Sequence, residues 1–217
     1  MVDDDPFTRS TLASSLQVLG CFVVAADSVS SALRTMRNFS AESAPNVALL
    51  DLDLGEGPTG LDLAQTLREE FPSLAIVMLS TYQDPRLIGT NLPSLPEGSI
   101  YLVKSSVSSP QVLGDSIKNA LNGVKQRKDS PAEISNKAIT LNDLSDKQIE
   151  MMRLVASGLS NSEIAKRQWI TEAAVEKAIS RLCKKLEIVV SKEQNLRVLI
   201  AGAYHQYSGS VNVRSDS

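Results

Sequence analysis

A few acidic, basic and hydroxyl side chains stand where apolar segments of the chain end. VALLD ends at Asp51, IVMLS ends at Ser80 and YLVK ends at Lys104, and three consecutive carboxylates begin at Asp3. In an open parallel sheet, ligands bind at the carboxyl ends of the strands. The spacing therefore predicts that five side chains meet in one crevice: Asp3, Asp4, Asp51, Ser80 and Lys104.

These residue types suit phosphoryl chemistry. Carboxylates packed together repel one another, and the repulsion raises their pKa values. A divalent cation relieves it, and carboxylates that share their ion with several waters suit Mg²⁺. A lysine and a hydroxyl beside such an ion form a cradle for a phosphoryl group. Any one of these residues is more simply explained as a polar strand end or helix cap, but five at successive strand ends favour a site.

The elements that must position these residues alternate along the first half of the chain. Short apolar runs predict buried strands at 21–26, 46–51, 74–79 and 99–103. Helical patterns with an apolar face lie around them at 7–19, 28–38, 60–70 and 109–124. Buried strands that alternate with amphipathic helices are typical of a parallel sheet covered on both faces.

The composition excludes several classes of protein. The chain has 217 residues and only 4% aromatics, so we expect no aromatic platform for carbohydrate or single-stranded nucleic acid. One histidine, His205, and two cysteines, Cys21 and Cys183, argue against Ser-His-Asp catalysis, a four-ligand zinc site and a disulfide framework. No apolar run approaches the roughly 20 residues of a membrane span, and Val-Asp-Asp-Asp after Met1 is unlike a signal peptide. We expect a soluble protein of the reducing cytoplasm.

The charge is distributed unevenly. The net charge is −3, but residues 1–125 carry 8 basic and 14 acidic side chains, whereas residues 126–217 carry 14 basic and 11 acidic ones. An acidic half joined to a basic half predicts two modules with different partners. The stretch 125–140 is polar, contains a proline and lacks an apolar period, which predicts a linker between the modules.

The segments VDDDP, VALLDLDLGEGPTG, IVMLST and YLVK resemble the receiver domain of bacterial response regulators, over about residues 1–124. The resemblance implies that Asp51 is the phosphoacceptor, whose carboxylate attacks a phosphohistidine on a kinase. It also implies that Asp4, the side chain of Asp51 and the backbone carbonyl of Asp53 bind Mg²⁺, with Asp3 acting through water.

The same resemblance assigns roles to three residues beside the acceptor. Lys104 would pair with the phosphoryl oxygens, and Ser80 would move toward the phosphoryl group and hydrogen-bond it. Tyr101 would swing inward when Ser80 moves. The tight loop from Gly55 to Gly60 would close the pocket.

Three features depart from the receiver pattern. Only Met1 and Val2 precede the acidic cluster, where a receiver has its first, central strand, so we expect unpaired backbone groups and bare core surface. Either the true start lies upstream or the receiver is impaired. Pro93 and Pro96 interrupt the segment where a full fourth helix is usual. Lys104 is followed by Ser-Ser rather than by an acid or a proline.

A rival interpretation uses the same aspartate. Asp51-Leu-Asp53 after a buried strand also fits the haloacid-dehalogenase phosphatases, which have a nucleophilic aspartate and an acid two residues later. Those enzymes need a further acidic metal pair downstream of their lysine. No Asp-Asp pair follows Lys104, and the acidic cluster comes first instead. We therefore favour a receiver that is not an enzyme; turnover of a generic phosphate ester would favour the phosphatase.

The second half has a purely helical pattern. Helices are predicted at 145–156, 161–168 and 172–186, with a turn at Gly158. Capping boxes mark helix starts at Ser145, Ser160 and Ser191. Two short helices joined by a tight turn suit a helix-turn-helix, whose second helix enters the major groove of DNA.

The interior and surface of this half can be predicted from its apolar spacing. An apolar stripe is predicted to pack inside: Ile164, Ala165, Val175, Ile179, Leu182 and Leu186. Trp169 and Cys183 are also expected in the core, and His205 on the surface. The opposite, charged face is also explained by solvation alone, and a short helical bundle could be a protein-interaction module. The tight turn, the capping boxes and the local positive charge favour DNA.

The motif GLSNSEIA, the helix start TEAAVEK and the end KKL resemble the LuxR-type DNA-binding domain over about residues 141–205. That domain includes a fourth helix, here near 191–204, which is often used for dimerisation. The resemblance implies base reading by Glu176, Lys177 and Ser180, and Glu176 could accept from cytosine N4. It implies phosphate contacts from five residues: Lys166, Arg167, Thr171, Arg181 and Lys184.

Together the two resemblances indicate a NarL/FixJ-type response regulator. The predicted fold is an α/β, doubly wound, five-stranded parallel sheet of the flavodoxin-like kind, followed by an all-α helix-turn-helix domain. The predicted parts are a receiver (1–124), a linker (125–140), a DNA-binding domain (141–207) and a disordered tail (208–217).

The predicted function is transcription regulation controlled by Mg²⁺-dependent phosphorylation of Asp51. The expected partners are a sensor histidine kinase, double-stranded DNA and a second copy of the chain in the active state, with no membrane. The alternative is a LuxR-type regulator whose degenerate receiver no longer uses phosphorylation.

Overall fold

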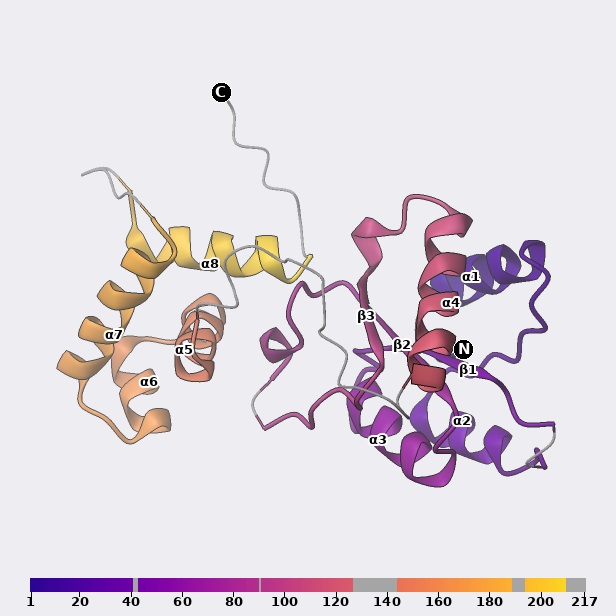
Figure 1. Ribbon diagram of the computed structural model, residues 1–217. Coiled ribbons are helices and arrows are strands. Elements are labelled where there is room, and N and C mark those ends of the chain that lie inside the picture. The colour runs from indigo at the N-terminus through magenta and orange to yellow at the C-terminus, as the bar shows by residue number, and fades with distance from the viewer. Residues whose placement is uncertain (41–42, 90, 127–143, 189–193, 210–217) are drawn as a thin grey trace. The chain divides into compact units, whose positions relative to one another are not determined.

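A computed structural model describes residues 1–40, 43–89, 91–126, 144–188 and 194–209. The chain divides into two compact units. The first, here called the α/β unit, comprises Met1–Ser80 and Leu92–Ser135, and the second, the helical unit, comprises Thr81–Asn91 and Asn136–Ser217 (Figure 1). The helical unit therefore includes a short segment from the middle of the first half of the chain.

The α/β unit is built on a parallel sheet with the strand order β1-β2-β3. The strands are β1 (Val47–Asp51), β2 (Ala75–Ser80) and β3 (Ile100–Val103). All residues of β2 are buried, as expected for a central strand covered on both faces. The register pairs Asp51 with Leu79 and Ser80 with Val103, so the polar ends of β1 and β2 lie at the same edge of the sheet.

Helices cover both faces of this sheet. On one face α4 (Pro110–Gln126) packs against the strands and α1 (Pro6–Val18) packs against α4. On the other face α3 (Gly60–Glu70) packs against β1 and β2, and α2 (Val29–Met36) packs against α3 (Figure 1). Each of the four helices predicted in this half is thus confirmed within a few residues. The side chains buried between α1, α4 and the sheet are Leu16, Leu49, Ala75, Val77, Leu79, Leu102, Leu113 and Ala120.

The prediction of five strands is wrong for the described residues, which form three. Residues 21–26, predicted as a strand, form no ladder. Within that segment only Ala26 pairs, in an isolated bridge with Val2, and Val2 also bridges to Leu50. The physical reason is that only Met1 and Val2 lie between residues 21–26 and β1. The backbone of residues 21–26 therefore pairs with a neighbouring segment at one end only.

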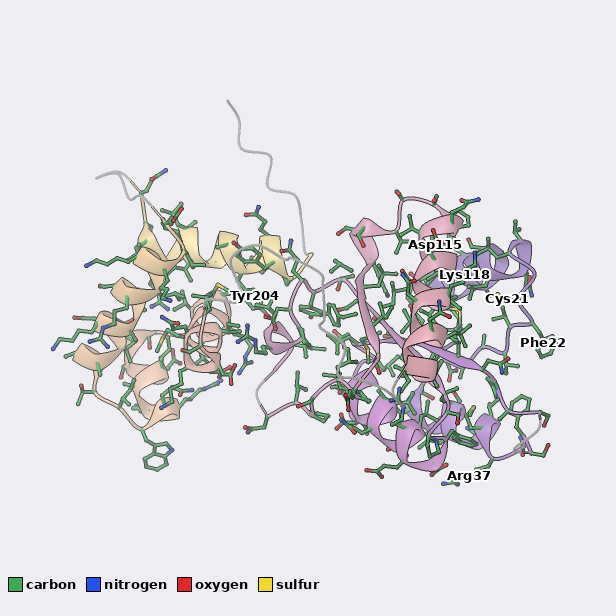
Figure 2. All side chains as sticks on the ribbon, in the orientation of Figure 1. Cys21, Phe22, Arg37, Asp115, Lys118 and Tyr204 are labelled. Atoms are coloured by element: carbon green, nitrogen blue, oxygen red, sulfur yellow. The ribbon has the colours of Figure 1, made fainter. Side chains whose placement is uncertain are left out.

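An apolar cavity of about 460 Å³ lies beside β1, lined in part by Val24, Ala48 and Leu49. The amino group of Met1 donates to the carbonyl of Val24 at 2.6 Å. Burial lowers the pKa of this amino group from 8.0 to about 6. Phe22, on the outer side, is 91% exposed and points away from the sheet (Figure 2). The expected bare core surface is therefore present.

The helical unit contains α5 (Asp146–Ala156), α6 (Asn161–Gln168), α7 (Glu172–Lys185) and α8 (Leu196–Tyr207). The α5 helix packs against α7 and α8, and α6 packs against α7. The capping boxes at Ser145 and Ser160 are confirmed, since Gln148 accepts from the Ser145 N–H at 2.9 Å and Glu163 accepts from the Ser160 N–H at 2.8 Å. None of the described helices is both long and apolar enough to cross a membrane.

Some expectations lie outside the described residues. These are the capping box at Ser191, residues 127–140 of the predicted linker and residues 210–217 of the predicted tail. The fourth helix predicted near 191–204 starts later, at Leu196, because Asn195 caps it by accepting from the Arg197 N–H at 2.9 Å.

The connection from β2 to β3 has no α-helix among its described residues, 81–89 and 91–99. It contains one turn of 3₁₀-helix, η1 (Pro85–Leu87), which packs against α5. The interruption expected from Pro93 and Pro96 is therefore confirmed.

Candidate functional site

The predicted crevice at the carboxyl edge of the sheet is centred on Asp3, Asp51 and Lys104. The ammonium Nζ of Lys104 lies 2.9 Å from Oδ2 of Asp51 and 3.0 Å from Oδ2 of Asp3. Both acids are buried, with 7% and 1% of their surface exposed, and they belong to segments about fifty residues apart in the sequence. The spatial prediction for these three residues is confirmed.

Asp4 completes a group of carboxylates. One oxygen of Asp3, one of Asp4 and one of Asp51 all lie within 4.8 Å of one another, and Asp4 is exposed. Among the described residues this is the one group of three or more acids, histidines or cysteines close enough to hold a metal ion. Hard oxygen ligands at the edge of the solvent are the donor set that suits Mg²⁺ with some of its waters retained.

Burial and charge oppose each other in this crevice. Burial raises the pKa of Asp51 from 3.8 to about 6, although the hydrogen bond and the charge of Lys104 work to lower it. Burial also acts to lower the pKa of Lys104, but the hydrogen bonds to Asp51 and Asp3 outweigh it, and that pKa lies above its usual value. The lysine therefore stays charged, while the acceptor carboxyl takes up a proton more readily than an exposed aspartate does.

Backbone contacts hold the acids in place. The Val2 N–H donates to the carbonyl of Leu49, and the Asp51 N–H donates to the carbonyl of Val2, both at 2.8 Å. These two bonds place Asp3 beside Asp51. Arg9, which the sequence analysis missed, donates from Nη1 to the carbonyl oxygens of Asp3 at 2.6 Å and Asp4 at 3.1 Å. The sequence signal that could have identified Arg9 was a basic residue near the start of a helix that directly follows an acidic run.

A glycine fixes the loop after β1. An ideal Cβ built on Gly60 would overlap the backbone oxygen of Asp51. Thr59 and Asp62 close the start of α3 here, with the Thr59 N–H donating to Asp62 at 2.7 Å. The predicted loop from Gly55 to Gly60 thus returns the chain directly against the candidate acceptor.

The remaining predicted site residues lie nearby in different environments. Ser80 is fully buried at the end of β2, and Tyr101 is half-buried in β3, paired with Met78. The carboxylate of Asp53 is outside the group of three, and it accepts from the Gly55 N–H at 3.2 Å. The predicted role of Asp53 concerned its backbone carbonyl, and it stays a prediction.

The second candidate site is the exposed side of α6 and α7. All eight residues predicted to touch DNA are exposed: Lys166, Arg167, Thr171, Glu176, Lys177, Ser180, Arg181 and Lys184. Thr171 caps α7 by accepting from the Ala174 N–H at 3.2 Å. The predicted apolar stripe is buried except for Leu186, which is half-buried, and Cys183 is buried as expected. His205 is exposed, also as expected.

The predicted burial of Trp169 is wrong. It was expected in the core, yet 93% of its surface is exposed. The reason is local: Trp169 ends α6 in a left-handed conformation with φ of 54°, and this backbone turn directs the indole outward while the chain reverses into α7. An apolar residue at a helix end is a poor indicator of burial when the backbone turns there.

Two family descriptions match the chain. Residues 1–103 match the response regulator receiver domain, and residues 142–198 match the bacterial regulatory proteins of the luxR family. The chain is a DNA-binding response regulator. Its receiver domain carries the acidic crevice, and its LuxR-type domain carries the exposed face of α6 and α7.

Relatives of this response regulator extend over most of its length. The nitrate/nitrite response regulator protein homolog of Haemophilus influenzae is 29% identical over 87% of this chain and 89% of its own length. The transcriptional regulatory protein DesR of Bacillus subtilis is 29% identical over 70% of this chain and 71% of its own length. A solved complex of the two-component response regulator RcsB with DNA shares the fold, with a TM-score of 0.54 and 18% identity over 97% of this chain and 96% of that one.

Proposed function

We propose that this response regulator is switched by phosphorylation of Asp51, with a sensor histidine kinase as donor. A carboxylate oxygen of Asp51 attacks the phosphorus of a phosphohistidine, an O–P bond forms, and the P–N bond breaks as the imidazole leaves with a proton. The observation that carries the proposal is the contact of Lys104 with both Asp51 and Asp3. A cation held there by two buried acids is positioned to pair with phosphoryl oxygens.

The acidic group fits Mg²⁺. Lys104 contacts Oδ2 of Asp51, which leaves Oδ1 and the exposed carboxylate of Asp4 as ligands, together with the backbone carbonyl of Asp53, while Asp3 acts through water. When bound, the ion supplies positive charge that offsets the negative charge of the phosphoryl group. The residues of the chain hold the ion, orient the acceptor and keep Lys104 protonated.

The response to phosphorylation is assigned to Ser80 and Tyr101. Ser80 lies at the end of the strand next to Asp51 and would move to donate its hydroxyl to the phosphoryl group. Tyr101, in the following strand, would move inward as Ser80 leaves its place. The receiver boundary at 124 and the DNA-binding domain at 141–207 remain part of this proposal.

The output is binding of double-stranded DNA by α7 in the major groove, as a homodimer in the cytoplasm. Glu176, Lys177 and Ser180 would read base edges. Phosphate contacts would come from Lys166, Arg167, Thr171, Arg181 and Lys184. Because phosphate contacts release counterions, affinity should fall steeply with salt. Substitution Lys184→Ala should reduce that salt slope by about one.

The experiment is incorporation of phosphate from a small acyl-phosphate donor such as acetyl phosphate, followed by intact mass. The expected result is one phosphate on the native chain with Mg²⁺ present and none after chelation. Asp51→Asn should take up none. Full labelling of that variant, or labelling that ignores Mg²⁺, would place the acceptor elsewhere.

A second candidate is a regulator that does not use phosphorylation. The three-stranded sheet and the cavity beside β1 favour it, because both are departures from an intact receiver. In that case neither Mg²⁺ nor the donor should change the thermal unfolding or the DNA affinity of the native chain.

A further inference from the structure

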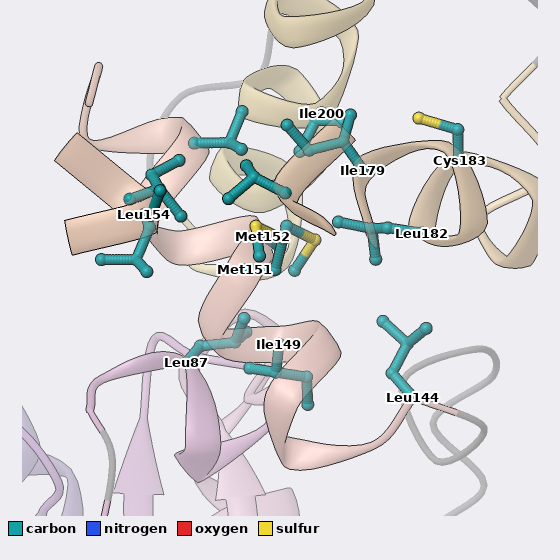
Figure 3. Packing of buried hydrophobic residues seen from close by; sticks show 14 residues of the cluster. Leu87, Leu144, Ile149, Met151, Met152, Leu154, Ile179, Leu182, Cys183 and Ile200 are labelled. Atoms are coloured by element: carbon teal, nitrogen blue, oxygen red, sulfur yellow. The ribbon is translucent and has the colours of Figure 1, made fainter. Parts of the chain in front are cut away.

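Trp169 lies outside the apolar core of the helical unit. That core brings Ile179 and Leu182 of α7 together with Met152 of α5 (Figure 3), and among the described residues it includes neither Trp169 nor its neighbour Ile170. Ile170 is 41% exposed, so two adjacent apolar side chains meet solvent at the turn between α6 and α7. The unit therefore packs without the indole, whose apolar surface is available to a partner.

The backbone of the turn fixes the indole in this exposed position. The N–H groups of Trp169 and Ile170 both donate to the carbonyl of Ala165, the second of them at 3.0 Å. Glycine adopts a φ of 54° without strain, whereas tryptophan does not. Residues held in strained conformations are concentrated at functional sites. The turn thus presents a large aromatic side chain where the fold alone would favour glycine.

The charges around the turn suit an anionic partner. Lys166 and Arg167, in the last turn of α6, come shortly before the indole in the sequence, and both are exposed. Thr171 follows it and caps α7, a helix of 14 residues whose N-terminus carries partial positive charge. Glu172, in the first turn of α7, is the opposing charge, and the two basic side chains outnumber it. The indole therefore lies among groups that favour phosphate.

We propose that Trp169 binds the sugar-phosphate backbone of double-stranded DNA, with its ring against deoxyribose and its indole N–H donating to a phosphate oxygen. The inference rests on the proposed DNA face of α6 and α7, since Lys166, Arg167 and Thr171 of that face flank the indole in the sequence. Tryptophan combines an apolar body with one polar N–H, which suits a surface of alternating sugars and phosphates. Such contacts position a protein on the duplex without reading its sequence, so the indole should add affinity on any duplex.

The first test uses the fluorescence of Trp169 itself. The chain has one tryptophan, so the intrinsic emission of the full-length native protein reports this position alone. Without DNA, an indole that is 93% exposed should emit at long wavelength and be quenched freely by acrylamide. A mixed-sequence duplex at low salt should shift the emission to shorter wavelength and lower the acrylamide quenching constant severalfold. The anisotropy of a labelled duplex, measured in parallel, shows when the DNA is bound.

Two outcomes of this test would overturn the contact. In the first, the duplex is bound but the emission and the acrylamide quenching of Trp169 stay unchanged, which would leave the indole to a protein partner. In the second, the same protection from acrylamide appears when the protein is concentrated without DNA, which would place the indole against a second copy of the chain.

The second test measures the affinity of full-length variants for two duplexes of unrelated sequence. Trp169→Gly removes the indole and relieves the backbone strain, so a weaker complex would not reflect a less stable fold. We expect it to bind both duplexes roughly tenfold more weakly, since a hydrogen bond to a charged group is worth about that factor. Trp169→Phe keeps a ring but lacks the N–H, so it should lose less. A loss confined to one duplex would disprove a contact with the backbone.

Two further variants separate this inference from the proposed function. Phe7→Ala removes an exposed aromatic ring from α1, in the α/β unit, and should bind DNA as the native chain does. The indole is neutral and displaces no counterion, so both Trp169 variants should keep the native salt slope, whereas Lys184→Ala lowers it by about one. If Lys184→Ala lowers the slope while Trp169→Gly binds as tightly as the native chain, the proposed DNA face stands and the indole contact is disproved. If Lys184→Ala and Lys177→Ala both bind as the native chain does, the proposed DNA face is wrong and the indole contact fails with it.

Discussion

The ammonium of Lys104 lies 2.9 Å from the carboxylate of Asp51, yet the pKa of Asp51 is raised to about 6. Burial therefore changes the pKa of Asp51 by more than the ion pair with Lys104, which acts in the opposite direction. Two further acids in the crevice, Asp3 and Asp4, act in the same direction as burial. The ionised form of Asp51 is therefore energetically unfavourable in this crevice, and binding of a cation or a proton reduces that cost.

The raised pKa of Asp51 predicts a pH dependence of stability in Mg²⁺-free buffer. The folded chain keeps a proton on Asp51 up to about pH 6, whereas the unfolded chain releases it near 3.8. The free energy of unfolding should therefore fall as pH rises through that window, by roughly 3 kcal/mol from this group. Urea unfolding from pH 4 to 7 measures the effect.

Asp51→Asn is the matched control, because the amide cannot ionise. It should remove the contribution of this group and be more stable than the native chain at pH 7 without Mg²⁺. Equal stability of the two proteins at pH 7, under those conditions, would show that the acceptor carboxylate carries no such cost.

The contact between Gly60 and Asp51 predicts that a methyl group disrupts the site. Gly60→Ala would place a Cβ in steric overlap with the backbone oxygen of Asp51, so the loop and the acceptor must shift. We expect a loss of stability of about 1–3 kcal/mol or more and a marked loss of phosphate uptake. Gly202→Ala in α8, where nothing lies within 4 Å of the added Cβ, should keep both properties. Normal phosphate uptake by Gly60→Ala would contradict the prediction.

The cavity beside β1 predicts that an added strand stabilises the α/β unit. Placing Val-Leu-Ile-Val before Met1 should fill part of the space between β1 and residues 21–26 and pair backbone groups on both sides. Ordering the four added residues costs conformational entropy. After this cost is subtracted, we expect the free energy of unfolding to rise by on the order of 1–3 kcal/mol, seen as a higher Tm. Gly-Ser-Gly-Ser in the same place should give no such gain.

The added strand should also change the pH profile. In the native chain the unfolded state holds more protons on the Met1 amino group between about pH 6 and 8, so stability should rise with pH across that range. Extension moves the amino group away and should remove this rise. An unchanged profile would mean that the amino group of Met1 is not buried in solution.

The left-handed conformation of Trp169 predicts a stabilising substitution. A bulky residue with φ of 54° is strained by about 1 kcal/mol, and glycine is not. Trp169→Gly should therefore raise the stability of the helical unit by up to that amount, measured by urea unfolding followed by circular dichroism. Trp169→Phe, which keeps the strain, should leave it unchanged. A destabilised glycine variant would show that the indole makes contacts that outweigh the strain.

Much of this architecture follows from the sequence because the relevant signals are local or periodic. The apolar runs that end at Asp51 and Ser80 predicted two parallel strands and the edge at which their polar ends meet. The caps at Ser145 and Ser160 predicted where helices begin, since each depends on residues three positions apart. The gathering of Asp3, Asp51 and Lys104 followed from the general rule that strand ends share one edge of a parallel sheet.

Only the tertiary structure decided the features that depend on partners distant in sequence. Residues 21–26 have the composition of a strand but form none, because a strand exists only when a neighbour offers hydrogen bonds along its length. Trp169 is apolar but exposed, because the left-handed backbone at the end of α6 directs its side chain toward solvent. The segment Thr81–Asn91 belongs to the helical unit because Leu87 fills a gap among helices that begin nearly sixty residues later, and no local pattern encodes a gap of that kind.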